Sequence, residues 1–136
     1  MMNKQFMEIE HTADIAIRVW GRDLAELFVN AAYGMACQLT DPDDVSKTLK
    51  RKIELEADDA EVLLVTWLGE LLYLGEQDDC VFTSFDMLEI TPTHLQAIVQ
   101  GGLVQEHLAH IKAVTFSELE IVQDDEGYET IVVFDV

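Results

Sequence analysis

The sequence predicts an α+β fold, in which two helices pack on one face of a largely antiparallel sheet. Short segments that alternate apolar and polar residues recur along the chain, a period of two that is typical of half-buried strands. Two longer segments place apolar residues three and four positions apart, which is the spacing of an amphipathic helix. The second half of the chain is rich in strand patterns, and the sequence shows no internal repeat or low-complexity segment.

Two strands are predicted before the first helix, over residues 6–9 and 15–20. The helix is predicted over residues 24–39, where apolar side chains recur at helical spacing. Asp23 followed by Glu26 is the pattern of a capping box, which satisfies the free N–H groups at a helix start. This part of the chain therefore predicts the order strand, strand, helix.

The second helix is predicted after another strand, which covers residues 52–57 and carries one charged face. Asp58 with Glu61 repeats the capping pattern and opens a helix through about Leu74. This helix is apolar on most sides, so we expect it to lie across a sheet in the middle of the fold. Gly75 is its predicted stop.

The rest of the chain is predicted to be mainly β-strand, with segments separated by turn-forming residues. Gly101 and Gly102 are predicted to begin a polar loop that reaches His110. Residues 124–127 predict a turn in which the final glycine takes a positive φ. The predicted strands are 81–90, 95–99, 111–116, 118–123 and 128–136.

Composition limits the functional classes. A chain of 136 residues predicts one domain over residues 1–136, and 49% hydrophobic residues are enough for a core. The 27 acidic and 8 basic residues give a net charge of -19. A surface that follows phosphates needs Lys and Arg, so direct nucleic-acid binding is not expected. The acidity could serve docking on a basic partner, but solubility is the favoured explanation.

Several features predict a soluble cytoplasmic protein without a membrane partner. Cys37 and Cys80 have no metal-type spacing and are expected to be free thiols in a reducing compartment. The N-terminus lacks the apolar region of a secretory signal. The most apolar stretch, residues 62–74, is interrupted by Gly69 and Glu70 and is too short to span a bilayer.

Three acidic groups form the leading candidate site: Asp14, Asp135 and the α-carboxylate of Val136. Oxygen-only anionic ligands suit a hard cation such as Ca²⁺ or Mg²⁺ better than Zn²⁺. Two carboxylates about 4 Å apart repel by roughly 4 kcal/mol at an effective dielectric near 20, so a clustered trio would call for a cation. From the residues alone the favoured interpretation is that these acids are solvated and apart, because nothing local places Asp14 beside the C-terminus.

Other candidate residues have simpler explanations. His107 and His110 are three apart, the spacing of ligands on one helical face, but without further ligands nearby they are expected to be surface loop histidines. His11 has no nucleophile beside it, so a structural role is expected. Lys112 is the sole Lys or Arg in residues 53–136 and is expected to neutralise nearby carboxylates, with presentation to a partner or phosphate as the alternative.

Four short motifs, in order, resemble the archease family over essentially the whole chain. The opening motif is followed by a Trp-Gly pair and the first helix, and the other motifs fall in the second helix, a late strand and the last strand. They are His11-Thr12-Ala13-Asp14-Ile15 with Trp20-Gly21 and Leu24 to Met35; Trp67 to Leu74; Lys112-Ala113-Val114-Thr115-Phe116; and Val132-Val133-Phe134-Asp135-Val136.

The resemblance implies a module with a strand-helix-strand-strand core that acts as a non-enzymatic protein cofactor of an RtcB-type RNA ligase. Such a cofactor promotes guanylylation of the ligase and its multiple turnover in tRNA splicing or RNA repair. The resemblance also carries a metal site onto Asp14, Asp135 and Val136, with Ca²⁺ as the first expectation and Mg²⁺ or Mn²⁺ as alternatives. Many members have Tyr-His where this chain has Phe116-Ser117, so a role for a phenol or imidazole does not carry over.

Two alternative functions stay open at this point. The first is a stand-alone metal-dependent phosphoester hydrolase, which the absence of a recognisable nucleophile or base pair in the sequence disfavours. The second is a metal-free protein-interaction module, whose melting temperature would not respond to Ca²⁺.

Overall fold

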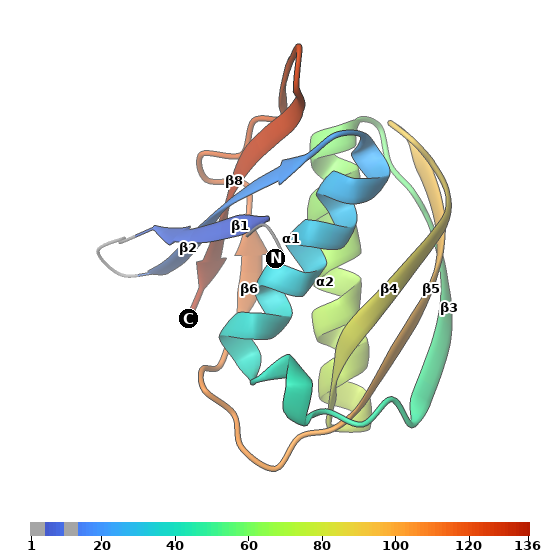
Figure 1. The fold of residues 1–136 in the computed structure, drawn as a ribbon, viewed down its shortest axis with the longest axis vertical. Coiled ribbons are helices and arrows are strands. Elements are labelled where there is room, and N and C mark those ends of the chain that lie inside the picture. Colours follow the sequence, from blue (N-terminus) through green and yellow to red (C-terminus); the bar gives the residue numbers. More distant parts are fainter. Residues whose placement is uncertain (1–4, 10–13) are drawn as a thin grey trace.

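The fold has three layers, with two helices held between a five-stranded and a three-stranded sheet (Figure 1). The computed structural model describes residues 5–9 and 14–136. The elements in chain order are β1 (Phe6–Ile9), β2 (Asp14–Gly21), α1 (Leu24–Leu39), a 3₁₀ turn (Pro42–Asp44), β3 (Leu49–Glu56), α2 (Ala60–Asp78), β4 (Cys80–Thr91), β5 (His94–Leu103), β6 (Ala113–Thr115), β7 (Val122–Asp124) and β8 (Gly127–Asp135).

The predicted α+β class with two helices and antiparallel strands is confirmed, and the strands form two sheets. The larger sheet has the order β1-β2-β8-β6, and β7 also pairs with β8. The smaller sheet has the order β3-β5-β4. Every strand pair is antiparallel. The larger sheet therefore joins the two ends of the chain, whereas the smaller one is built from its middle.

Helix α1 begins and ends where the sequence predicts. The Asp23 carboxylate accepts a hydrogen bond from the backbone N–H of Glu26 at 2.8 Å, and the Glu26 carboxylate accepts one from the backbone N–H of Arg22 at 3.1 Å. These side chains satisfy N–H groups at the helix start, as a cap requires. The helix ends at Leu39, and the backbone N–H of the cap residue Thr40 still donates to the carbonyl of Ala36.

Helix α2 continues one turn beyond its predicted end. Gly75 is buried inside the helix, and the left-handed cap is Asp79, with φ 52° and ψ 47°. A Cβ on Gly75 would lie 2.7 Å from the backbone carbonyl oxygen of Cys80, so this glycine serves a close approach of β4. The prediction that Gly75 ends the helix is therefore wrong.

One hydrophobic core connects both sheets through the helices. Trp67 of α2 is fully buried and lies at its centre. Its indole N–H donates to the backbone carbonyl of Phe28 in α1 at 3.0 Å, which joins the two helices. Its ring also meets the ring of Phe85 in β4 edge to face, with centroids 6.1 Å apart. Packing around this indole thus holds the layers together.

Two predictions about the second half of the chain are wrong. Gly101 and Gly102 are not in a loop, because β5 continues through them to Leu103. A Cβ on Gly101 would collide with the backbone carbonyl of Val81, so the absent side chain permits strand contact rather than a turn. The strand predicted over 118–123 is reduced to Val122–Asp124.

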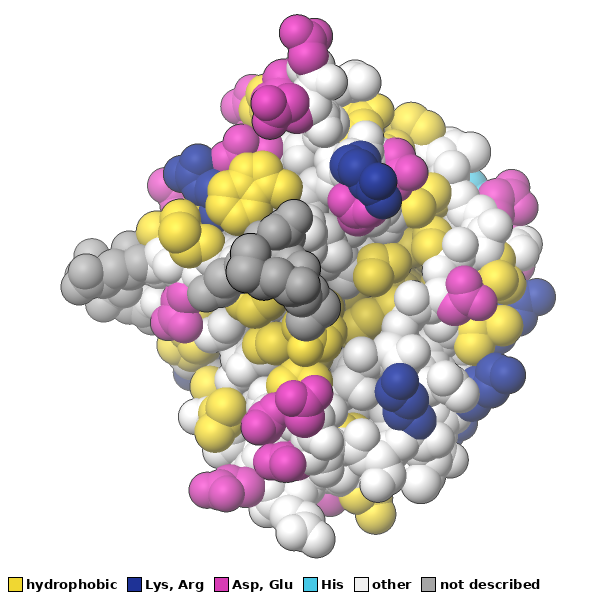
Figure 2. Space-filling model, viewed as in Figure 1, with side chains coloured by type: hydrophobic (Ala, Val, Ile, Leu, Met, Phe, Trp, Pro, Cys, Tyr) yellow, Lys and Arg dark blue, Asp and Glu magenta, His cyan; other side chains and the backbone are white. Residues whose placement is uncertain are grey.

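The turn at residues 124–127 agrees with its prediction. Gly127 takes a φ of 136°, a conformation that other residues rarely adopt. The Asp124 carboxylate accepts hydrogen bonds from the backbone N–H groups of Glu126 and Gly127 at 2.8 and 3.1 Å. Figure 2 shows acidic side chains gathered at the top of the view, where this turn projects.

Candidate functional site

Asp14 and Asp135 are direct neighbours across the β2–β8 ladder. Asp14 opens β2, Asp135 closes β8, and their Cα atoms are register partners. Side chains of residues directly opposite in an antiparallel pair emerge on the same face, with Cβ atoms about 5 Å apart. The antiparallel register therefore brings together two carboxylates that lie 121 positions apart in the sequence.

The two carboxylates lie on the outer face of the larger sheet. Ile15 and Phe134, the next register pair, alternate to the opposite face, where Phe134 is fully buried in the core. Asp135 is exposed and Asp14 is half-buried. Like charges directly opposite destabilise a strand pair, so a cation shared by this carboxylate pair would stabilise this end of the sheet.

The backbone of Asp135 is held from both sides. On one side it pairs with Asp14, and on the other it pairs with Ala113 of β6. The backbone N–H of Lys112 also donates to the carbonyl of Asp135 at 2.7 Å. The end of the last strand thus has a defined position, and Lys112 itself, with an exposed side chain, lies beside the carboxylate pair.

Val136 follows Asp135 and is 40% exposed. Within the described residues, no set of three or more His, Cys, Asp and Glu side chains is arranged to hold a metal ion. The sequence predicts the main-chain oxygens of Val136 as the third ligand of a site at the carboxylate pair. The donors are then all oxygen and mostly anionic, which suits a hard divalent cation.

Three of the motifs noted in the sequence converge at this end of the larger sheet. The strands that carry Asp14, Val114 and Phe134 are neighbours in the order β2-β8-β6. Phe116, just after β6, is 58% exposed, and the backbone N–H of Ser117 donates to the hydroxyl of Thr115 at 3.2 Å. This region combines acidic groups with an exposed aromatic ring.

The remaining predicted site residues are placed as follows. His107 and His110 are exposed and lie in the irregular segment 104–112, so they are surface loop histidines, and the alternative of two ligands on one helical face is wrong. His11 lies outside the described residues. The Lys112 ammonium makes no ion pair with any residue that the structure describes.

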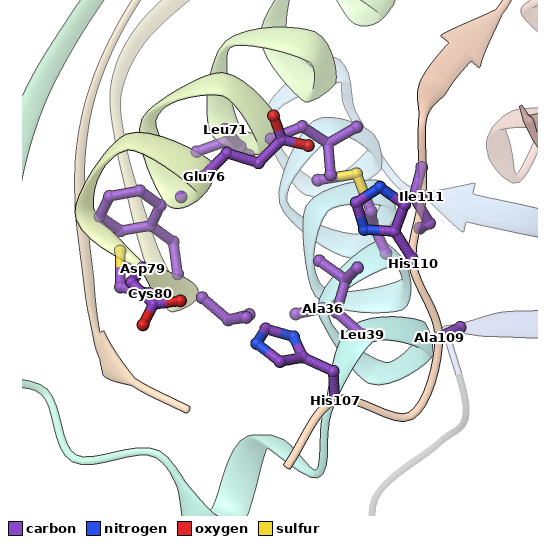
Figure 3. A pocket seen from close by; sticks show the side chains of 15 residues that line it. Ala36, Leu39, Leu71, Glu76, Asp79, Cys80, His107, Ala109, His110 and Ile111 are labelled. Atoms are coloured by element: carbon purple, nitrogen blue, oxygen red, sulfur yellow. The ribbon is translucent and has the colours of Figure 1, made fainter. Parts of the chain in front are cut away.

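A cavity that the sequence did not reveal opens at the C-terminal ends of the two helices (Figure 3). We call it the helix-end pocket, and its volume is about 240 Å³. Its walls come from α1, α2, the start of β4 and the segment 104–112. The lining residues are Met35, Ala36, Leu39, Leu71, Leu72, Gly75, Glu76, Asp79, Cys80, Val81, Phe82, His107, Ala109, His110 and Ile111.

Neither Cys37 nor Cys80 forms a disulfide within the described residues, and Cys80 is buried. Burial raises the pKa of the Cys80 thiol, and the nearby Asp78 carboxylate raises it further. A raised pKa keeps the sulfur protonated and poorly nucleophilic. Cys80 is therefore a packing residue of the helix-end pocket and no candidate nucleophile.

The chain matches the model of the Archease protein family (MTH1598/TM1083) over residues 6–136. The chain belongs to the archease family. Curated archeases of Methanosarcina acetivorans and Methanosarcina barkeri are 38% and 36% identical to it over 141 residues, which cover 98% of this chain and 97% of each relative.

Solved structures of this family have the same fold. The solution structure of protein 1598 from Methanobacterium thermoautotrophicum is 30% identical, with a TM-score of 0.82 over 98% of this chain and 100% of that one. The crystal structure of a Thermotoga maritima archease, described as a possible chaperone, gives a TM-score of 0.69 at 21% identity over 94% of each chain. In the described part of this archease, no helix is long and apolar enough to cross a membrane.

Proposed function

We propose that this chain is a non-enzymatic activator of an RtcB-type RNA ligase, promoting guanylylation of the ligase and its multiple turnover in tRNA splicing or RNA repair. The observation that carries the proposal is the direct register of Asp14 with Asp135 at an exposed end of the larger sheet. Family membership supports it, because the resemblance that implies this role is to archeases.

Asp14, Asp135 and the main-chain oxygens of Val136 would hold a divalent cation, with Ca²⁺ the first candidate and Mg²⁺ or Mn²⁺ the alternatives. Such an ion supplies positive charge that offsets developing negative charge on phosphate oxygens. The residues of this chain hold the carboxylates in fixed register and present them at the surface. The neighbouring β6 segment fixes Asp135 from the other side.

The position of the carboxylate pair favours an activator over an enzyme. Asp135 is exposed, and the lining of the helix-end pocket includes neither Asp14 nor Asp135. Small-molecule catalysis usually needs a concave site that surrounds the substrate and excludes water. An exposed pair of carboxylates is better suited to completing a site on another protein.

The proposal is tested by measuring guanylylation and repeated turnover of the ligase from the same organism, with and without this protein. Asp14→Ala and Asp135→Asn are expected to abolish the stimulation seen with the unsubstituted protein. Asp125→Asn, at an exposed acid in the turn between β7 and β8, is the matched control and should stimulate fully. Circular dichroism and melting curves establish that each variant is folded.

The same preparations discriminate the other two functions. Full stimulation by both Asp14→Ala and Asp135→Asn would contradict the role of the carboxylate pair. Phosphoester hydrolysis by the purified protein with Mg²⁺ or Mn²⁺ would instead support a hydrolase. A melting temperature that does not respond to Ca²⁺ would support a metal-free module, since a site filled at 100 times its dissociation constant adds about 2.7 kcal/mol.

A further inference from the structure

The helix-end pocket has fixed walls. The backbone N–H of Leu108 donates to the carbonyl of Leu39 at 2.9 Å, which ties the segment 104–112 to the end of α1. The Thr40 hydroxyl makes a second, longer contact with the carbonyl of Glu106 at 3.4 Å. Ile111, only 1% exposed, anchors the far end of the same segment in the core. The pocket is therefore preformed.

The size of the pocket selects the kind of group it can hold. Ligand sites for cofactors and drug-sized molecules usually span about 300 to 1,000 Å³, so a cavity of about 240 Å³ is too small for most of them. A cavity of roughly 150 Å³ lined by apolar side chains can hold a benzene-sized group. The floor here is apolar, with Ala36, Leu39 and Leu71 among its residues. One large aliphatic or aromatic side chain fits these dimensions.

The mouth of the pocket favours positive charge. The carboxylates of Glu76 and Asp79 line it, and no Lys or Arg is among its lining residues in the described chain. Neither α1 nor α2 has a basic residue in its last turn, so the partial negative charge of both helix ends is not offset there. The neighbouring Asp78 is already paired with Arg51 at 2.8 Å. Glu76 and Asp79 form no ion pair with a residue that the structure describes, so their carboxylates complement a cation placed just outside the cavity.

A metal ion is a poor match for this charge. His107 and His110 also line this pocket, but within the described residues no three such side chains are arranged to coordinate an ion (Figure 3). An apolar floor with an acidic rim instead has the layout of a protein interaction site, in which a buried anchor fills a hollow and polar groups surround it.

We propose that the helix-end pocket binds one large apolar side chain of a partner protein whose chain carries Arg or Lys immediately after that anchor. The anchor fills the space between Ala36, Leu71 and Ile111. The following basic side chains pair with Glu76 and Asp79 at the rim. The identification of the RNA ligase as this partner rests on the proposed function. The preference of the pocket for an apolar side chain followed by Arg or Lys is independent of it.

The preference is tested with short blocked peptides and the full chain, followed by amide NMR shifts. A peptide GGLRRG is expected to bind saturably and to shift the signals of Ala36, His107 and Ile111. Replacing its leucine, as in GGSRRG, or its arginines, as in GGLEEG, should weaken binding at least tenfold. Failure of GGLRRG to bind, shifts confined to other surfaces, or equal affinity for the leucine and serine peptides would overturn the proposal.

Two variants examine the two halves of the pocket separately. Ala36→Leu narrows the cavity from α1, and Glu76→Lys reverses the charge at the rim. Each should weaken GGLRRG binding at least tenfold. Asp125→Lys makes the same charge change on the distant β7–β8 turn and should bind within twofold of the unsubstituted protein. If Asp125→Lys and Glu76→Lys lose equal affinity for GGLRRG, the net charge of the protein alone explains the effect, and the proposal is overturned. Glu76 is exposed, so its variant stays informative if Ala36→Leu does not fold.

The ligase is examined separately by direct association with the purified protein. Ala36→Leu and Glu76→Lys are expected to weaken association at least tenfold. If the peptides bind as described but the ligase does not associate with the unsubstituted protein, the pocket preference stands and the proposed function fails. If the ligase associates equally with all variants, the ligase is not the partner that uses this pocket.

Discussion

The two sheets of this archease are assembled in opposite ways. The three-stranded sheet comes from one continuous part of the chain, β3 to β5, and its β4–β5 pair is a hairpin with a short turn. The five-stranded sheet instead pairs β2 with β8, at opposite ends of the sequence. Only the second arrangement can bring Asp14 beside Asp135. The comparison shows that the candidate site is a product of long-range pairing, whereas the smaller sheet provides a wall for the core.

The largest expected effect comes from the helices that join the sheets. Trp67→Ala should lower the free energy of unfolding by about 3–5 kcal/mol, because it removes a fully buried indole and its hydrogen bond to Phe28. Chemical denaturation measures this loss. If both sheets depend on the same core, near-UV and far-UV circular dichroism should report a single transition. Two separated transitions would show that the sheets are independent.

The next effect concerns the smaller sheet. Gly101→Ala should cost about 1–3 kcal/mol, since its Cβ would collide with the backbone of Val81 and Phe82 beside a bulge in β4. Gly69→Ala is the matched control, because a Cβ there meets nothing within 4 Å and improves helix propensity. Urea denaturation compares the two. Equal stability for both variants would contradict the close strand contact at Gly101.

A smaller effect is expected at the chain ends that form the larger sheet. In the presence of a chelator, Asp135→Asn should raise stability by roughly 0.2–1 kcal/mol, because it removes a like charge directly opposite Asp14. With Ca²⁺ the unsubstituted protein should instead be more stable than Asp135→Asn, because it gains free energy from binding the ion that the variant lacks. Melting curves with chelator and with Ca²⁺ test this, and Asp125→Asn should show neither change.

The smallest effect is a pH dependence on the outer face of the smaller sheet. The hydrogen bond from His94 to Glu54, 3.0 Å long, raises the pKa of His94 above its ordinary 6.5 and lowers that of Glu54 below 4.5. The His94 contribution is present below its ordinary pKa and is lost as pH rises through the folded value. The Glu54 contribution is present above its ordinary pKa and is lost as pH falls through the folded value.

The pair therefore stabilises the fold most between the two ordinary pKa values. His94→Gln should lower the melting temperature more at about pH 5.5 than at about pH 8.5. Comparing the variant with the unsubstituted protein at each pH removes the general effect of acidity on this acidic chain. A loss of equal size at both pH values would show that the ion pair contributes nothing.

Local patterns predicted most of the elements but misread several glycines. The limits of α1 follow from the Asp23 cap and the apolar spacing, both of which are properties of neighbouring residues. The sequence predicts a helix stop at Gly75 and a loop at Gly101, because glycine usually marks chain breaks. Their actual role is to let another strand approach closely, and the partner of such an approach is remote in sequence.

The sequence predicts only part of the candidate site. The residues Asp14, Asp135 and Val136 were named from a resemblance and from the chemistry of oxygen ligands, but their mutual position depends on the β2–β8 register. The helix-end pocket could not be foreseen at all. The sequence predicts loop positions for His107 and His110, and the structure confirms them, yet no local pattern shows that the ends of two helices meet behind them.

Alternation of apolar residues, helical spacing and helix caps were enough to establish the α+β class and the helices of this chain. These properties follow from interactions between residues a few positions apart. The division into two sheets, the meeting of Asp14 with Asp135 and the shape of the helix-end pocket came from packing of the whole chain. Such features arise when the core closes, because burial of apolar surface selects one pairing of distant segments among many that local preferences allow.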